Sequence, residues 1–194
     1  MEWNTMFFIN SILLGIGLAM DAFSVSLANG LNEPNMKANR MCVIAGVFAF
    51  FQGLMPMLGY ICVHTIVIYF KDFEKFIPWI ALGLLLFIGG KMLIEGIRNK
   101  GEEETFMKLS VGALLVQGIA TSIDALSVGF TIAEYSVIMA LVGALIIAII
   151  TFIICFAGLI IGKKVGTKLS GKAGVFGGII LMAIGLEIFL TGIF

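Results

Sequence analysis

The sequence predicts an all-α polytopic membrane protein, with six transmembrane helices arranged as two inverted three-helix repeats. Three observations lead to this fold class. Hydrophobic residues make up 60% of the 194 residues, charged residues only 12%, and the mean hydropathy is +1.12, whereas soluble domains are about a quarter charged. Long apolar segments recur along the chain, and one polar motif occurs in both halves.

Six segments are long and apolar enough to cross a membrane as helices, which takes about 20 residues for ~30 Å of hydrocarbon. The connections between them are short, so we expect one integral membrane domain. Its first repeat covers 1–98, a charged cytoplasmic linker covers 99–108, and the second repeat covers 109–194. The expected spans are 5–29, 42–68, 77–98, 109–132, 137–162 and 174–194.

The repeated motif places one carboxylate in the first span and one in the fourth. It runs Gly15-Ile-Gly-Leu-Ala-Met-Asp-Ala-Phe-Ser-Val and then Gly118-Ile-Ala-Thr-Ser-Ile-Asp-Ala-Leu-Ser-Val, so Asp21 aligns with Asp124. A weaker match aligns Gln52 with Thr151. Because each half has three helices, the second half enters the membrane from the opposite face. Inverted repeats with a site near the midplane are found in many secondary transporters.

The distribution of Lys and Arg predicts the orientation. The first, third and fifth connections carry nine such residues, and the other side carries only Lys71 and Lys75. Positive charge next to membrane spans marks the cytoplasmic side. We therefore expect a multi-pass protein of the bacterial cell membrane with the odd connections in the cytoplasm and both termini outside.

Asp21 and Asp124 are the principal candidates for a functional site. Each lies about 5 Å from the middle of its span at ~1.5 Å per residue, and an Asp at the centre of a membrane helix costs roughly 2.5–3.5 kcal/mol. Two such residues at equivalent positions indicate a shared use. Straight helices would leave them about 10 Å apart along the membrane normal, so one shared site and two adjacent sites both remain open.

Further oxygen donors lie near these carboxylates. Residues three or four apart share one face of a helix, so Ser24 lies beside Asp21. Carboxylate, hydroxyl and amide oxygens are hard donors that suit Mg²⁺, Ca²⁺ or Mn²⁺. The hydroxyls could instead bond only to their own helices, and the amides and carboxyls could simply join helices. The candidate metal ligands are Asp21, Asp124, Ser24, Ser127, Thr121, Gln52 and Gln117.

The charge balance of the spans indicates a cation. We expect Asp21, Asp124 and Glu187 to be buried or nearly so, with Lys91 as the clear cation and Glu95 pairing with it or reaching the cytoplasmic interface. These last three are supporting charges rather than ligands. At least one negative charge then needs a proton or a bound cation. The residues thus predict a cation transporter with protons as the coupling ion.

Other classes of protein fit the sequence less well. Twelve basic and twelve acidic residues give no reason to expect a nucleic-acid partner. The three cysteines lie in apolar segments without CxxC spacing, so neither a disulfide framework nor a permanent cofactor is expected. Intramembrane aspartyl enzymes also use two membrane Asp residues, but Gly17-Leu-Ala-Met-Asp lacks a GxGD arrangement, so no enzyme is expected. The glycine-rich helices are compatible with a homodimer.

Four motifs occur in order along the chain: Met20-Asp-Ala-Phe-Ser24, Phe51-Gln-Gly-Leu-Met-Pro-Met-Leu-Gly59, Gly89-Gly-Lys-Met-Leu-Ile-Glu-Gly96 and Ala120-Thr-Ser-Ile-Asp-Ala-Leu-Ser-Val-Gly129. Together they resemble the bacterial manganese-efflux pumps of the MntP type, which are related to the LysE-like exporter group. The resemblance covers essentially the whole chain and implies export of Mn(II) from the cytoplasm, with Asp21 and Asp124 as the matching carboxylates. Some members have Glu where this chain has Gln52, and Arg where it has Lys91. Oxygen ligands alone do not rank Mn²⁺ above other cations, so export of another cation or of an amino acid is the alternative.

Overall fold

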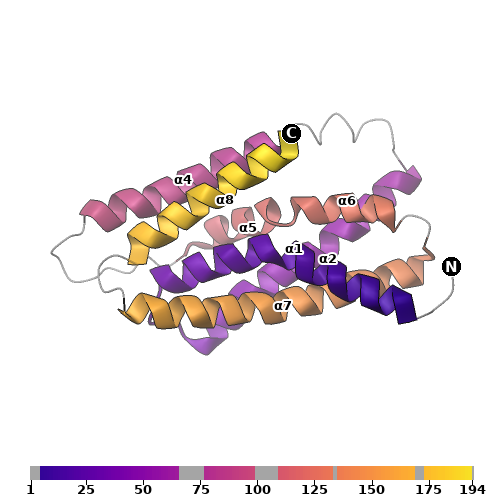
Figure 1. Cartoon of the computed structure of the whole chain (residues 1–194), viewed down its shortest axis with the longest axis horizontal. Helices are drawn as coiled ribbons and strands as arrows, with labels where there is room; N and C mark the ends of the chain where they lie inside the picture. Colours follow the sequence, from indigo (N-terminus) through magenta and orange to yellow (C-terminus); the bar gives the residue numbers. More distant parts are fainter. Residues whose placement is uncertain (1–4, 66–76, 99–108, 133–134, 169–172, 194) are drawn as a thin grey trace.

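The described part of the chain is entirely helical and contains no strand. The structure is a computed structural model, and it describes residues 5–65, 77–98, 109–132, 135–168 and 173–193 (Figure 1). Its helices are α1 (Thr5–Asn32), α2 (Ala38–Thr65), α4 (Ile77–Arg98), α5 (Val111–Ala120), α6 (Ile123–Thr131), α7 (Val137–Lys168) and α8 (Ala173–Ile193).

Helices occupy all six of the predicted ranges, and an all-helical membrane protein is confirmed. Among the residues that the structure describes, three helices are long and apolar enough to cross a membrane, at Thr5–Asn32, Ala38–Cys62 and Val137–Gly166. The pair Val111–Ala120 and Ile123–Gly129 makes a fourth candidate span, bent by 43°. The predicted linker 99–108 and the last residues of the second predicted span lie outside the described residues.

The fourth predicted span is broken at Thr121 and Ser122, between α5 and α6. The Thr121 hydroxyl donates to the Gln117 carbonyl at 2.9 Å, and the Ser122 hydroxyl donates to the Gly118 carbonyl at 2.7 Å. Hydroxyl groups that bond back to the preceding turn compete with the backbone N–H groups and bend helices. Asp124 lies in the first turn of the next helix, where its Oδ1 accepts the Ala125 N–H at 2.9 Å. Local side-chain bonds thus explain the break.

The helices pack mainly across the two halves of the sequence. α1 lies along α7, and α4 lies along α8, as Figure 1 shows. α2 packs against α7 and also against α6 and α5, while α1 and α2 have few contacts with one another. One hydrophobic cluster includes Ile44, Phe48 and Leu159, and a second includes Leu18 and Val128. The broken segment is therefore held by α2 rather than by its sequence neighbours.

Two of these helix contacts depend on glycine. A Cβ added at Gly129 of α6 would lie 2.6 Å from the Cα of Gly59 on α2, and a Cβ at Gly162 of α7 would lie 3.0 Å from the Cα of Gly30 on α1. Both distances are shorter than ordinary carbon contacts of about 3.5–4.0 Å. Small residues allow membrane helices to approach in this way.

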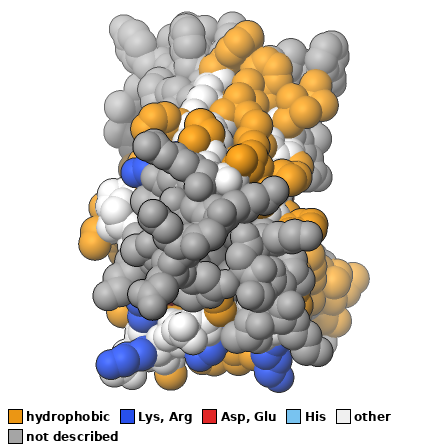
Figure 2. Space-filling model, turned by 90° about the vertical axis from the view of Figure 1, so that its left-hand side faces the viewer, with side chains coloured by type: hydrophobic (Ala, Val, Ile, Leu, Met, Phe, Trp, Pro, Cys, Tyr) orange, Lys and Arg blue, Asp and Glu red, His pale blue; other side chains and the backbone are white. Residues whose placement is uncertain are grey.

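The surface separates into apolar sides and a basic end. Large apolar side chains are widely exposed along the helices, with Phe50 62% and Ile138 66% exposed, as expected where lipid replaces water. Figure 2 looks onto the end where α7 finishes and α2 begins, and it shows Lys and Arg side chains there. Lys37, Arg40, Lys163 and Lys164 belong to these helix ends. We call this the basic end.

Candidate cation site

The segments that carry the two predicted carboxylates come together in the structure. Asp21 lies in the middle of α1 and Asp124 lies in the first turn of α6, and the carbonyls three residues before them both accept from the Gln52 side chain. Asp21 is half-buried, whereas Asp124, expected to be nearly buried, is exposed in the isolated chain. Exposure to lipid would be costly for a carboxylate at this depth. The position of Asp124 therefore suits a water-filled path or a protein surface.

Gln52 links the two carboxylate-bearing segments through its side-chain amide. Its Nε2 donates to the Leu18 carbonyl on α1 at 2.5 Å and to the Thr121 carbonyl at 3.3 Å. These carbonyls lie three residues before Asp21 and Asp124, respectively, so they occupy equivalent places in the repeated motif. In an unbroken helix the Ala125 N–H would bond to the Thr121 carbonyl, but here it bonds to Asp124. Gln52 supplies a donor to that carbonyl instead.

The Gln52 side chain is fully buried, and its Oε1 has no hydrogen-bond partner among the described residues. The same holds for the hydroxyl of Thr151 on α7, the residue aligned with Gln52 in the repeat. Both oxygens are hard donors. Gln52 therefore acts as a donor through its nitrogen and retains an acceptor oxygen.

The predicted hydroxyl ligands bond to their own helices or lie exposed. The Ser24 hydroxyl donates to the Met20 carbonyl at 3.0 Å, and Thr121 donates to the Gln117 carbonyl. Ser127 is exposed, one turn beyond Asp124. A hydroxyl that donates its hydrogen keeps two acceptor lone pairs, so these bonds are compatible with cation binding.

Gln117 is paired with Asn29, a residue that was not singled out from the sequence. Asn29 Nδ2 donates to Gln117 Oε1 at 2.8 Å, and Gln117 Nε2 donates to Asn29 Oδ1 at 3.4 Å. Both side chains are buried, 3% and 0% exposed. The amide oxygen of Gln117 is thus already an acceptor at a helix–helix contact. A polar amide in an otherwise apolar part of the first span was the available signal for Asn29.

Of the three supporting charges, only the Lys91 side chain is described. It is exposed on α4. The side chains of Glu95 and Glu187 lie outside the described part of the molecule.

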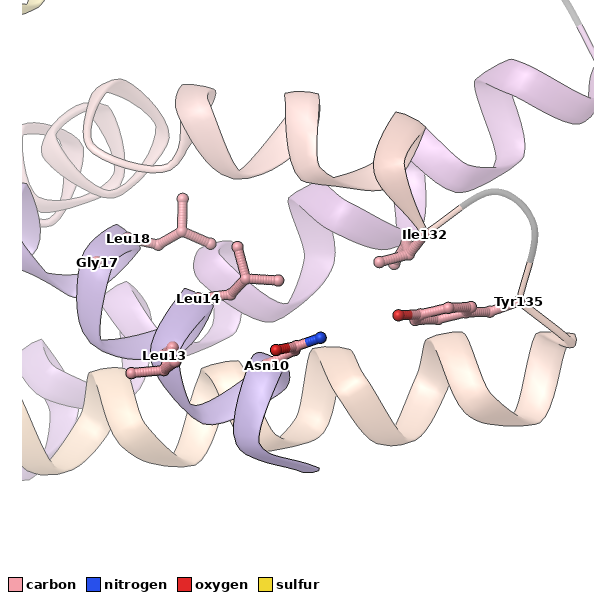
Figure 3. A pocket seen from close by; sticks show the side chains of 7 residues that line it. All are labelled: Asn10, Leu13, Leu14, Gly17, Leu18, Ile132 and Tyr135. Atoms are coloured by element: carbon pink, nitrogen blue, oxygen red, sulfur yellow. The ribbon is translucent and has the colours of Figure 1, made fainter. Parts of the chain in front are cut away.

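A cavity of about 580 Å³ adjoins the site on the side away from the basic end. Its wall includes Gly17 and Leu18, one turn from Asp21 on α1. Figure 3 shows Leu14 on α1 and Ile132 at the end of α6 on opposite sides of it. Asn10, Leu13 and Gly17 are exposed, so the cavity reaches the surface of the chain. The remaining lining residue is Tyr135.

The residues could hold a cation only with additional neutral oxygens. Within the described ranges no three His, Cys, Asp or Glu side chains gather in a group that could hold a metal. Two carboxylates would supply two negative charges, and hydroxyl, amide and water oxygens would complete the coordination. Mg²⁺ and other hard cations commonly keep several water ligands in this way.

The fold and these side chains define a multi-pass helical membrane protein with an acidic residue on each of two segments that Gln52 joins. Residues 35–189 match the family described as "Putative manganese efflux pump". A relative from Ruminiclostridium cellulolyticum, named "Putative manganese efflux pump MntP", is 41% identical over 94% of this chain and 95% of its own length. The relative of the same name from Bacteroides thetaiotaomicron is 37% identical over 94% and 95%.

The chain belongs to the MntP family of manganese efflux pumps, which confirms the resemblance read from the motifs. This is a family of transporters and not of enzymes. No solved structure matches the chain.

Proposed function

We propose that the chain exports Mn²⁺ from the cytoplasm and that the ion binds between Asp21 and Asp124. The observation that carries this proposal is that one side chain, Gln52, bonds to both carboxylate-bearing segments, at the carbonyls three residues before Asp21 and Asp124. Two like charges in a medium of low dielectric need a proton or a cation between them. A divalent cation balances both charges, and the names of the relatives specify manganese.

The helix contacts support an inverted repeat of two three-helix halves. In such a repeat, α1 corresponds to α5 and α6, and α2 corresponds to α7. The contact of α1 with α7 therefore corresponds to the contact of α2 with α5 and α6, and both contacts are present. The pairs α2–α7 and α4–α8 each join a helix to its own counterpart. Six spans follow if α4 and α8 cross the membrane beside the other helices. The bonds of Gln52 to Leu18 and Thr121 then lie near the pseudo-two-fold axis.

The two ends of the bundle support alternating access. The basic end faces the cytoplasm by the rule that positive charge stays inside, which leaves both termini outside. The cavity beside Leu18 lies toward the opposite end, as expected for an outward-facing state. Metal would bind the ionised carboxylates from inside and leave as protons from outside replace it.

Transport by purified protein in lipid vesicles tests this function. The parent should move Mn²⁺, and Asp21→Asn and Asp124→Asn should each abolish the flux because they remove one charge while keeping the side-chain size. Lys164→Gln, which changes an exposed charge at the end of α7, is the matched control and should transport normally. Transport by both Asp variants at the parent rate would refute the site.

The same vesicles resolve the cargo and the coupling ion. Vesicles offered Mg²⁺, Ca²⁺, Mn²⁺ or an amino acid in turn should show preferred transport of Mn²⁺. A pH-sensitive dye inside the vesicles should report proton movement opposite to the metal. Metal flux at the same rate with and without a pH gradient, and no dye response, would remove proton coupling from the proposal.

A further inference from the structure

At the basic end, a buried amide pair joins the two segments that carry the carboxylates. Asn29 on α1 and Gln117 on α5 bond to each other in both directions, at 2.8 and 3.4 Å. Asn29 lies eight residues after Asp21, and Gln117 lies seven residues before Asp124. At about 1.5 Å per residue both lie roughly 10–12 Å from the carboxylates along their helices. The pair therefore lies between the site and the basic end.

At the other end, the equivalent positions lie on a cavity. The alignment that places Asp21 on Asp124 also places Leu14 on Gln117 and Asn29 on Ile132. Leu14 and Ile132 line the cavity of about 580 Å³ and lie on its opposite sides (Figure 3). The same pair of repeat positions is thus joined at one end of the molecule and separated by a cavity at the other.

Side chains of Arg40 and Lys163 make further bonds at the basic end. Arg40 pairs with Glu33 at 2.9 Å and donates to the Leu109 carbonyl at 2.8 Å. Lys163 on α7 donates to the Met36 carbonyl at 2.8 Å. These contacts tie the α1–α2 connection to the residue before the α5 cap and to α7. They hold the ends of α1 and α5 in the neighbourhood of the amide pair.

We propose that Asn29 and Gln117 form the gate on the basic side of the cation site, and that Leu14 and Ile132 form the opposing gate. This inference rests on the proposed function, because it assigns the two gates of that transport path. In a protein built from inverted repeats, exchanging the conformations of the halves gives the other access state. The contact made by Asn29 and Gln117 is then made by Ile132 and Leu14, while the amide pair separates.

The chemistry of the two gates fits this exchange. Amides released from each other can bond to water, so the inner pair opens at a small net cost. Leu14 and Ile132 exclude water when they meet, because burial of apolar surface is favourable. Once open, the amide oxygens of Asn29 and Gln117 are hard donors facing a cation that enters from the basic side.

Thiol labelling in vesicles tests the gates in a background in which Cys42, Cys62 and Cys155 are replaced by Ala. Leu14→Cys, which leaves the amide pair intact, should react quickly with a water-soluble maleimide. Gln117→Ala, added to Leu14→Cys, should slow labelling by up to about fivefold, because the loss of one hydrogen bond shifts the equilibrium between the two access states by about that factor.

Two matched variants separate gating from simple loss of structure. Asn29→Gln combined with Gln117→Asn exchanges the two amides and should restore the labelling rate of Leu14→Cys. Gly46→Ala, which adds a methyl group that meets nothing within 4 Å, should leave the rate unchanged. Slow labelling in the amide-exchanged variant, or slow labelling with Gly46→Ala, would overturn the assignment of the inner gate.

Mn²⁺ flux is measured on the same vesicles, so the two proposals can fail separately. If the labelling rate of Leu14→Cys changes with the amide pair as expected, but neither the parent nor any variant transports Mn²⁺, the proposed function is refuted and the gates are supported. If Mn²⁺ is transported but the labelling rate of Leu14→Cys is the same with Gln, Ala or Asn at position 117, the gates are refuted and the proposed function is unaffected.

Discussion

Gln52→Leu should destabilise the protein, because it removes two buried hydrogen bonds that attach α1 and the broken span to α2. The bonds run from Nε2 to the Leu18 and Thr121 carbonyls, at 2.5 and 3.3 Å. Hydrogen bonds between membrane helices contribute about 0.6 kcal/mol each on average. Leu is similar in size to Gln, so no large cavity arises, and loss of the unpartnered Oε1 offsets part of the effect. We expect a net loss of about 1 kcal/mol.

Thermal unfolding in one detergent measures this loss. For a chain of this length, about 1 kcal/mol corresponds to a fall in Tm of roughly 2–4 °C. The matched control is Thr151→Val, because Thr151 aligns with Gln52, is fully buried, and has a hydroxyl without a partner in the described part of the chain. The Tm of Thr151→Val should be unchanged or higher than that of the parent. Equal falls in Tm for both variants would refute the reasoning from these bonds.

Two further variants test the packing and the basic end. Gly129→Ala should lower the Tm, because its methyl group would lie 2.6 Å from the Cα of Gly59. Overpacking costs about 1–3 kcal/mol, which exceeds the helix-propensity gain of about 1 kcal/mol. The control Gly46→Ala adds a methyl group that meets nothing within 4 Å and should be neutral or stabilising, so equal Tm shifts for both variants would contradict the contact. Arg40→Gln removes both the ion pair with the nearly buried Glu33 and the bond to the Leu109 carbonyl, so it should cost about 1–3 kcal/mol and make the Tm less sensitive to salt, and an unchanged salt response would count against the pair.

The helices could be located from the sequence because hydrocarbon imposes a minimum apolar length. The fifth predicted span starts at Val137, as α7 does. The ends are less accurate: α7 continues to Lys168, six residues beyond the prediction, and α2 begins four residues early at Ala38. Hydrophobicity reports where lipid ends, whereas helical hydrogen bonding continues into the polar region.

The break in the fourth span could not be predicted from the repeat. Its first copy, Leu18-Ala19 in α1, stays helical, while the second, Thr121-Ser122, does not. Both copies contain glycine, so glycine alone did not distinguish them. The difference is made by two hydroxyl groups that bond to the preceding turn, and these bonds depend on the folded geometry.

The carboxylates of the site could be predicted, but the partners of the amides could not. Asp21 and Asp124 were found because charge is rare in membrane helices. Gln117 was grouped with Thr121 by helical spacing, yet its partner Asn29 lies 88 residues away. Spacing within one helix does not report contacts between helices. The full ligand set, the coupling protons and a homodimer stay predictions.

The Arg and Lys contacts at the basic end also bear on biogenesis. During insertion, positive charges beside the spans determine which flank the translocon retains in the cytoplasm. In the finished bundle, Arg40 and Lys163 bond to the carbonyls of Leu109 and Met36. Under the proposed orientation, the same two cations contribute first to the orientation of the spans and later to the contacts between helices. A neutral substitution at either position removes both contributions at once.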